Sequence, residues 1–175
     1  PDMDLVGEQF MTSAALAASV DFDLLELDFS HGSLLASYLS PLTNRRSGEH
    51  GGPIEKRLRF PLEILRLARQ AWSSHRLLAV AFSVTDWCSG GINDEDALTA
   101  ARAFKDAGCD LIHVVTGQTT ARSAPRYGRG WETRYADMIR NEVEMPVLCG
   151  GFLTSLDEID TLLAAGRADL CLLSS

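Results

Sequence analysis

Short apolar runs alternate along the chain with longer segments in which apolar and polar residues follow a helical period. Runs rich in Leu, Val and Ile cover residues 23–27, 77–84, 110–115, 146–150 and 169–173. Apolar runs of this length predict strands that are buried on both faces, and the periodic segments between them predict amphipathic helices. The alternation indicates an α/β architecture in which helices cover a parallel sheet.

Two of the predicted helices carry clear start and stop signals. Asn93 precedes three acidic residues and is the predicted N-cap of a helix that ends at Gly108. Ser155 and Glu158 have the spacing of a capping box, and Gly166 marks the predicted end of that helix. Further helices are predicted at the start of the chain, at residues 54–72 and at residues 131–143.

The junction between helix and strand repeats along the chain. "DAGCDLIHV" (106–114) and "AAGRADLCLL" (164–173) both join a helix that ends on Gly to a strand that begins at Asp-Leu, and "SVDFDLLEL" (19–27) is a looser copy. Repeated βα units build either an open doubly wound sheet or a closed eight-stranded barrel. The chain opens on a helix and stops just after its fifth strand, so we expect it to be a fragment.

Composition narrows the classes of function. The 175 residues are 46% hydrophobic and carry a formal charge of -8, which argues against binding to nucleic acid or to an anionic membrane. Every apolar run is far shorter than the roughly 20 residues that span a bilayer. The four cysteines show no C-x-x-C pairing, so we expect a reducing cytoplasm.

Polar residues follow each predicted strand. Because the carboxyl ends of parallel strands meet at one edge of a sheet or barrel, these residues form the candidate site. They are Asp28, Ser30, His31 and Ser33; Thr85, Asp86 and Trp87; Thr116, Gly117 and Gln118; Gly150 and Gly151; and Ser174 and Ser175.

Several of these features have a structural alternative. Gly150 and Gly151 precede a capped helix and suit a phosphate, but a plain tight turn has the same signature. Asp28 and His31 could be half of a metal site, although no further ligand stands at the right spacing, so we predict no metal. His113 lies in the middle of a strand, where a hydrogen-bonded core histidine is favoured over a ligand.

The segments "LELDFSHGSLL" (25–35) and "SPLTNRRSGEHGGPIEKRLRFPLEIL" (40–65) resemble the old yellow enzyme family of flavin oxidoreductases. The resemblance covers nearly the whole chain and continues through residues 83–91, 110–120, 135–148 and 164–173. It implies an FMN-binding (β/α)8 TIM barrel, of which residues 1–175 would be a C-terminal fragment of about five βα units, strands four to eight. In a purely structural interpretation, residues 40–65 form an ion-pair loop that fixes a helix against the barrel.

Within that family the chain is most similar to one bifunctional type. "GQTT" (117–120), "YGR" (127–129), "IRNEV" (139–143) and "GRADLC" (166–171) resemble the reductase half of salicylyl-CoA 5-hydroxylase and 2-aminobenzoyl-CoA monooxygenase/reductase. This resemblance implies a flavin monooxygenase fused upstream of the barrel.

The resemblance also implies a reaction. In the family, hydride passes from NAD(P)H to FMN and then to an alkene activated by a carbonyl, here a small-molecule enone or an aromatic-CoA-derived dienone. His31 keeps one position that holds the carbonyl oxygen. Asp28 stands at the other position and Ser33 stands at the position of the proton-donating Tyr. An ionised Asp would repel an enolate, and a serine hydroxyl is much less acidic than a phenol.

The residues at the flavin-facing positions also differ from those of the family. Ala81 aligns with a strand-borne Arg that faces the flavin, and Ser174 and Ser175 align with a Gly-Arg pair that binds the phosphate. Gly150 and Gly151 correspond to backbone that faces the phosphate in the family. Of the phosphate-facing residues, only Gly151 is the same as in the family. Two interpretations follow: an FMN-dependent NAD(P)H oxidoreductase domain, or a flavin-depleted structural barrel that supports a fused aromatic-CoA monooxygenase.

Overall fold

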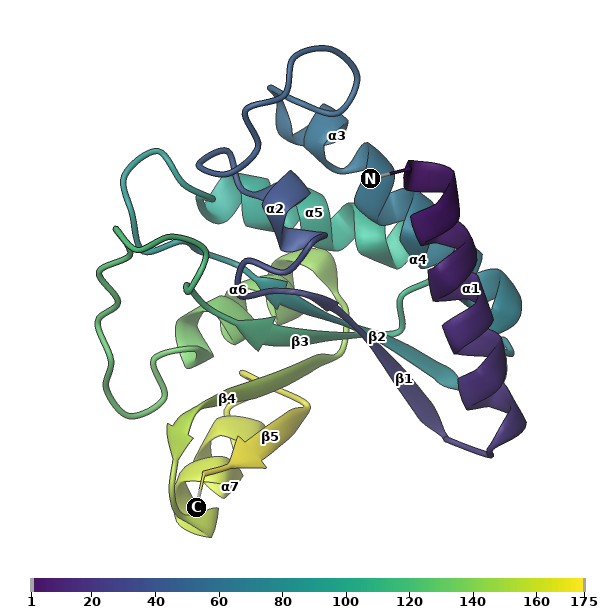
Figure 1. Ribbon diagram of the computed structural model, residues 1–175. Helices are drawn as coiled ribbons and strands as arrows, with labels where there is room; N and C mark the ends of the chain where they lie inside the picture. The colour runs from purple at the N-terminus through teal and green to yellow at the C-terminus, as the bar shows by residue number, and fades with distance from the viewer. Residues whose placement is uncertain (1, 175) are drawn as a thin grey trace.

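Five parallel strands form a single sheet in the computed structural model, which describes residues 2–174 (Figure 1). They are β1 Leu24–Phe29, β2 Leu77–Ser83, β3 Leu111–Val115, β4 Val147–Leu153 and β5 Leu170–Leu173. The strands lie side by side in the order β1-β2-β3-β4-β5, and every neighbouring pair is parallel. This order lacks the reversal point of an open doubly wound sheet and matches a section of a barrel.

Helices precede the first strand and connect the others. They are α1 Met3–Ser19, α2 Ala36–Leu39, α3 Ile54–Arg57, α4 Arg59–Ala71, α5 Asp94–Asp106, α6 Thr133–Val143 and α7 Leu156–Ala164. The predicted caps are confirmed: Asn93 accepts a hydrogen bond from the Asp96 N–H at 2.8 Å, and Ser155 and Glu158 form a capping box. Among residues 2–174, no helix combines the length and apolar character needed to cross a bilayer.

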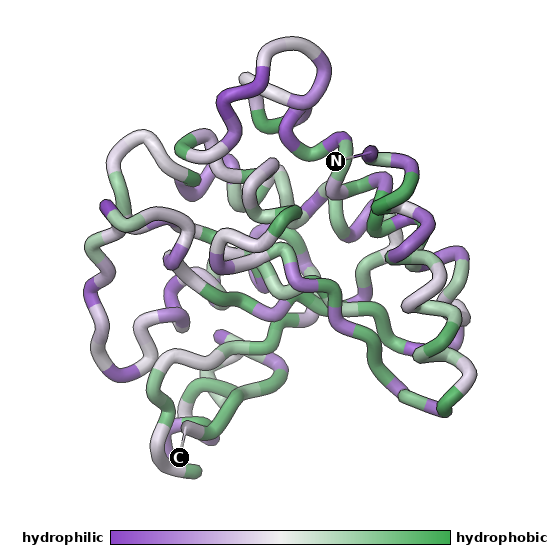
Figure 2. Tube along the Cα trace, viewed as in Figure 1, coloured by the Kyte–Doolittle hydropathy of each residue, from purple (hydrophilic) through white to green (hydrophobic). Residues whose placement is uncertain are grey.

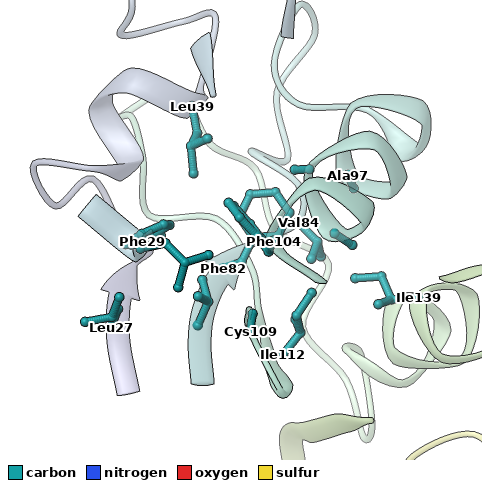
Figure 3. Packing of buried hydrophobic residues seen from close by; sticks show 14 of the residues in the cluster. Leu27, Phe29, Leu39, Phe82, Val84, Ala97, Phe104, Cys109, Ile112 and Ile139 are labelled. Carbon is teal, nitrogen blue, oxygen red and sulfur yellow. The ribbon is translucent and has the colours of Figure 1, made fainter. Parts of the chain in front are cut away.

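The hydrophobic core lies between the sheet and the helices that cover one of its faces. Leu78, Val80 and Phe82 of β2 point into this core and are at most 1% exposed. Phe104 of α5 stands edge-on to both Phe29 and Phe82, with ring centroids 5.5 Å apart in each pair (Figure 3). Edge-to-face pairs of this kind add about 0.5–1.5 kcal/mol beyond the burial of their area, so they hold β1, β2 and α5 together.

The opposite, inner face of the sheet carries Ala79, Ala81 and Ser83 of β2, as the alternation of β2 predicts. Leu24, Leu77, Leu170 and Leu172 lie on the inner face and are 38–51% exposed. In Figure 2 much of the trace along the strands has the colour of hydrophobic residues. The described helices therefore cover only the outer face, whereas the apolar runs predicted strands that are buried on both faces. In a closed barrel the inner face packs against the strands opposite.

Three element boundaries differ from the sequence expectations. The helix expected at 54–72 is interrupted at Leu58, because Pro61 has no N–H to donate to the carbonyl of Arg57. β1 extends to Phe29, so Asp28 lies within the strand rather than after it. β4 runs through Gly150 and Gly151 to Leu153, with an interruption of its pairing to β5 between Cys149 and Leu153.

Candidate active site at the carboxyl ends of the strands

Asp28, near the end of β1, is the first polar residue of the candidate site. The carboxylate of Asp28 accepts hydrogen bonds from the backbone N–H of Ser30 at 2.9 Å and from its hydroxyl at 2.5 Å. Asp28 is also in register with Ala81 of β2, which is in register with His113 of β3. These three residues therefore form one row across the sheet, next to the edge where the strands end.

His31 and Ser33 follow β1 in a tight turn. His31 is exposed and has a left-handed backbone, with φ 51°, and its N–H donates to Ser83 Oγ at 3.0 Å. The side chain of His31 makes no hydrogen bond within residues 2–174, so its ring is free to meet a ligand. Ser33 Oγ donates to the Asp28 carbonyl at 3.1 Å, which turns this hydroxyl toward the strand.

A polar contact on the inner face escaped the sequence analysis. His113 Nδ1 lies 3.0 Å from Glu26 Oε2, so a side chain of β3 meets one of β1 across β2. The contact passes over Ala79 and Ala81, which register with Glu26 and His113 and are small enough to leave room for it. Although helices do not cover this face, Ala79 is fully buried and Ala81 is only 5% exposed. The hydrogen-bonded role that the mid-strand position of His113 predicts is confirmed.

Glu132 lies on the β4 side of the Glu26–His113 contact. It is the N-cap residue of α6 and is 7% exposed. Burial raises the pKa of its carboxyl, although His113, the Gly150 N–H, Trp131 and Thr116 all act to lower it. A carboxyl whose pKa is raised can hold a proton closer to neutral pH, so the inner array (Glu26, His113 and Glu132) contains a potential proton donor.

The glycine pair of β4 lies against the start of α6. A Cβ at Gly150 would stand 3.1 Å from Glu132 Oε2, and a Cβ at Gly151 would stand 3.0 Å from the Glu132 backbone nitrogen. Gly151 also has φ 89°, which a side chain would strain. The two glycines therefore let Glu132 pack on β4. They lie in the strand, not in the loop that was expected.

The last predicted positions are Ser174 and Ser175. The Ser174 N–H donates to the Leu153 carbonyl at 2.7 Å, which continues the pairing between the ends of β4 and β5. Ser175 lies outside the described residues.

The segment at 40–65 has a structural role. Arg57 is 4% exposed, and its guanidinium pairs with Asp96 at 2.8 Å and donates to the carbonyls of Leu39 and Gly52. The contacts join α3 to α5, to the end of α2 and to the loop before α3. The buried ion pair of this segment therefore joins α3 to α5, whereas the ion pair that its loop forms, between Glu49 and Arg59, is exposed.

Other candidate residues are also engaged in structure. The Asp86 carboxylate is fully buried and accepts from Ser40 Oγ at 2.7 Å and from the Ile92 N–H at 2.8 Å, which ties two loops together. Burial raises the pKa of the Cys109 and Cys149 thiols to about 12, so neither is a ready nucleophile.

Comparison with known proteins gives a match over almost the whole chain. The NADH:flavin oxidoreductase / NADH oxidase family matches residues 2–174. An NADPH dehydrogenase of Geobacillus sp. (strain WCH70) is 34% identical over 173 residues, which cover 99% of this chain and 50% of the relative. An NADH oxidase of Thermoanaerobacter brockii is 31% identical over 172 residues, 96% of this chain and 26% of the relative. The chain therefore spans half or less of these relatives.

Solved structures share the fold. The complex of 2-naphthoyl-CoA reductase with 2-naphthoyl-CoA superposes with a TM-score of 0.88 at 24% identity, over 97% of this chain and 26% of that one. The old yellow enzyme homologue from Zymomonas mobilis superposes with a TM-score of 0.76 at 19% identity, over 97% of this chain and 47% of that one. The expected fold, five parallel βα units of a TIM barrel, is confirmed.

Proposed function

The chain belongs to the NADH:flavin oxidoreductase / NADH oxidase family, and on that premise we propose that the whole protein is an NAD(P)H oxidoreductase of the old yellow enzyme type. Family membership implies FMN as cofactor and NAD(P)H as reductant. Residues 1–175 would supply strands four to eight of the barrel. The observation that carries the proposal is the row Asp28, Ala81 and His113, which lies beside His31 where the strands end.

The inner face offers a polar group to the ring side of a flavin. Ala79 and Ala81 lie beneath the Glu26–His113 contact, and His113 stands one strand away from Ala81 in the same row. The family resemblance places a flavin-facing Arg at Ala81. We infer that His113, held by Glu26 at 3.0 Å, provides the nearest hydrogen-bonding group in its place. When bound, FMN supplies the hydride-transfer chemistry between NAD(P)H and the substrate.

The phosphate side fits less well. The Ser174 N–H is already used by the Leu153 carbonyl, and the Glu132 side chain occupies the space beside Gly150. Gly151, beside the interruption of the β4–β5 pairing, remains the one phosphate-facing position that follows the family pattern. These observations support weak FMN binding.

The rim of the site supports carbonyl recognition. His31 is exposed with a free ring, so it can donate a hydrogen bond to the carbonyl oxygen of an activated alkene. The Ser33 hydroxyl is weakly acidic and already donates to the Asp28 carbonyl, so proton delivery from it would be slow. We propose a small enone or an aromatic-CoA-derived dienone as substrate, the second on the basis of the motifs at 117–120, 127–129, 139–143 and 166–171.

The proposed activity is tested with the full-length protein supplied with FMN under anaerobic conditions. NADPH or NADH oxidation is followed with 2-cyclohexenone as the probe alkene, and the expected result is slow, FMN-dependent formation of the saturated ketone. His31→Ala should reduce the rate by about 10-fold or more, because it removes a donor to the developing oxyanion. Absence of turnover at saturating FMN would contradict the oxidoreductase proposal.

A second candidate is a flavin-depleted structural barrel that supports a fused aromatic-CoA monooxygenase. It is favoured by the Glu26–His113 contact over Ala81 and by the engaged Ser33 hydroxyl, since both lie where the family carries catalytic or flavin-binding groups. If this second candidate is correct, the full-length protein should contain no FMN throughout purification. Deletion of the barrel should lower the stability of the monooxygenase without changing its chemistry.

A further inference from the structure

An exposed aromatic cluster adjoins the site described above, on the loop before α6 and near the end of β4. Trp131 stands between Tyr127 and Phe152, with ring centroids 4.9 Å and 5.4 Å away. Tyr127 is 63% exposed and Phe152 is 60% exposed, so each outer ring offers a free face to solvent. Tyr127 and Trp131 belong to the loop between β3 and α6, which projects from the sheet at the left of Figure 1.

The cluster is held in place by polar contacts. The Trp131 indole N–H donates to Thr116 Oγ1 at 3.1 Å, which anchors the central ring to the end of β3. Phe152 has a left-handed backbone, with φ 61°, which is unusual for a bulky residue. Hydrogen bonds on either side of it, from the Gly130 N–H to Gly151 and from the Ser174 N–H to Leu153, maintain this conformation. Strained residues held in this way are often found where a ligand binds.

Charge and shape indicate what would bind there. Residues 116–131 contain Arg122, Arg126 and Arg129 and no acidic residue, in a chain whose formal charge is -8. Arg122 and Arg126 are exposed and form no ion pair within residues 2–174, whereas Arg129 pairs with Glu158 at 2.8 Å. Tyr127, Gly128, Arg129, Trp131 and Phe152 line a cavity of about 270 Å³, which suits one planar ring system rather than a whole coenzyme.

We propose that this aromatic cluster binds the phosphorylated adenosine end of a coenzyme. The adenine ring would stack on an exposed face of Tyr127 or Phe152, and the phosphates would meet Arg126, which precedes Tyr127 in the chain. NADPH and acyl-CoA thioesters both carry such an end, with an additional phosphate on the 2′ or the 3′ oxygen of the ribose. The choice of these two sources rests on the proposed function, but the binding itself needs neither flavin nor turnover.

The proposal is tested by calorimetric titration of the full-length protein with two redox-inert probes. Adenosine 3′,5′-bisphosphate represents the nucleotide end of CoA, and adenosine 2′,5′-bisphosphate represents that of NADPH. At least one of Tyr127→Leu and Phe152→Leu should weaken binding by about 10-fold, because the stacking face is lost. Arg126→Gln should weaken binding and reduce its dependence on salt. Phe22→Leu and Arg102→Gln, at exposed positions outside the loop, are the matched controls.

Each outcome has a defined meaning. Tighter binding of the 3′,5′ probe identifies acyl-CoA as the source, tighter binding of the 2′,5′ probe identifies NADPH, and equal binding supports a shared site. Lack of binding, unchanged affinity in Tyr127→Leu and Phe152→Leu, or adenosine binding as tightly as the bisphosphates would overturn the proposal. FMN affinity is measured in Tyr127→Leu as well; it should be unchanged, which separates this proposal from the oxidoreductase proposal.

Discussion

His113 Nδ1 and Glu26 Oε2 lie 3.0 Å apart although they come from strands that are not neighbours in the sheet. The contact is possible because β2, which runs between their strands, presents Ala79 and Ala81 to the inner face. A residue with a long side chain at Ala81 would have to displace or join this contact. The small side chain at Ala81 and the presence of the Glu26–His113 contact are therefore two aspects of one arrangement.

Glu132 should make stability depend on pH. Its pKa is raised in the folded protein, so the folded state keeps a proton that the unfolded state releases. The stabilisation is complete below the ordinary Glu pKa and is lost as pH rises through the folded pKa. Glu132→Gln should reduce this loss, which urea unfolding of both proteins at pH 5 and pH 8 measures. An equal change with pH in the two proteins would show that Glu132 is not responsible.

Arg57 should be important for folding of the loop and helix region. Arg57→Ala leaves Asp96 partly buried without its partner and frees the carbonyls of Leu39 and Gly52, so we expect a loss of about 3–5 kcal/mol in the free energy of unfolding. Arg59→Ala is the matched control, since Arg59 pairs with Glu49 at the surface and should cost less than about 1 kcal/mol. Similar losses in the two variants would contradict the assigned role.

Ser33 should contribute little to proton delivery. Its hydroxyl donates to the Asp28 carbonyl, so Ser33→Ala should leave the rate of alkene reduction nearly unchanged, whereas Ser33→Tyr should increase it. The measurement is the steady-state rate of the full-length protein with 2-cyclohexenone at saturating FMN. A large loss of rate in Ser33→Ala would mean that the serine has taken over the role of the tyrosine.

Residues 1–175 expressed alone should associate. Leu24, Leu77, Leu170 and Leu172 expose apolar surface on the inner face of the sheet, and such surfaces promote aggregation or dimerisation. Light scattering coupled to size-exclusion chromatography should show oligomers or poor recovery. A monomer with one sharp and reversible unfolding transition would instead indicate an independent five-stranded fold.

Local signals predicted much of the fold. The caps at Asn93 and Ser155 depend on side chains within three residues of each other, and the inner position of Ala81 follows from alternation within one strand. The Glu26–His113 contact depends on the register of three strands, which sequence spacing does not reveal. The extension of β4 through its glycines likewise depends on Glu132 packing against them and on an irregular pairing with β5.

FMN affinity shows whether this barrel keeps the flavin-binding architecture with a weakened site. Fluorescence titration of FMN compares the full-length protein with Ala81→Arg, and Ala164→Arg on the exposed end of α7 is the control for added charge. We predict weak binding by the unmodified protein and by the control. A charge-assisted hydrogen bond contributes about 1.5–3 kcal/mol, so Ala81→Arg should tighten binding by about 10- to 100-fold. Tight binding by the unmodified protein, or no gain from Ala81→Arg, would contradict the account.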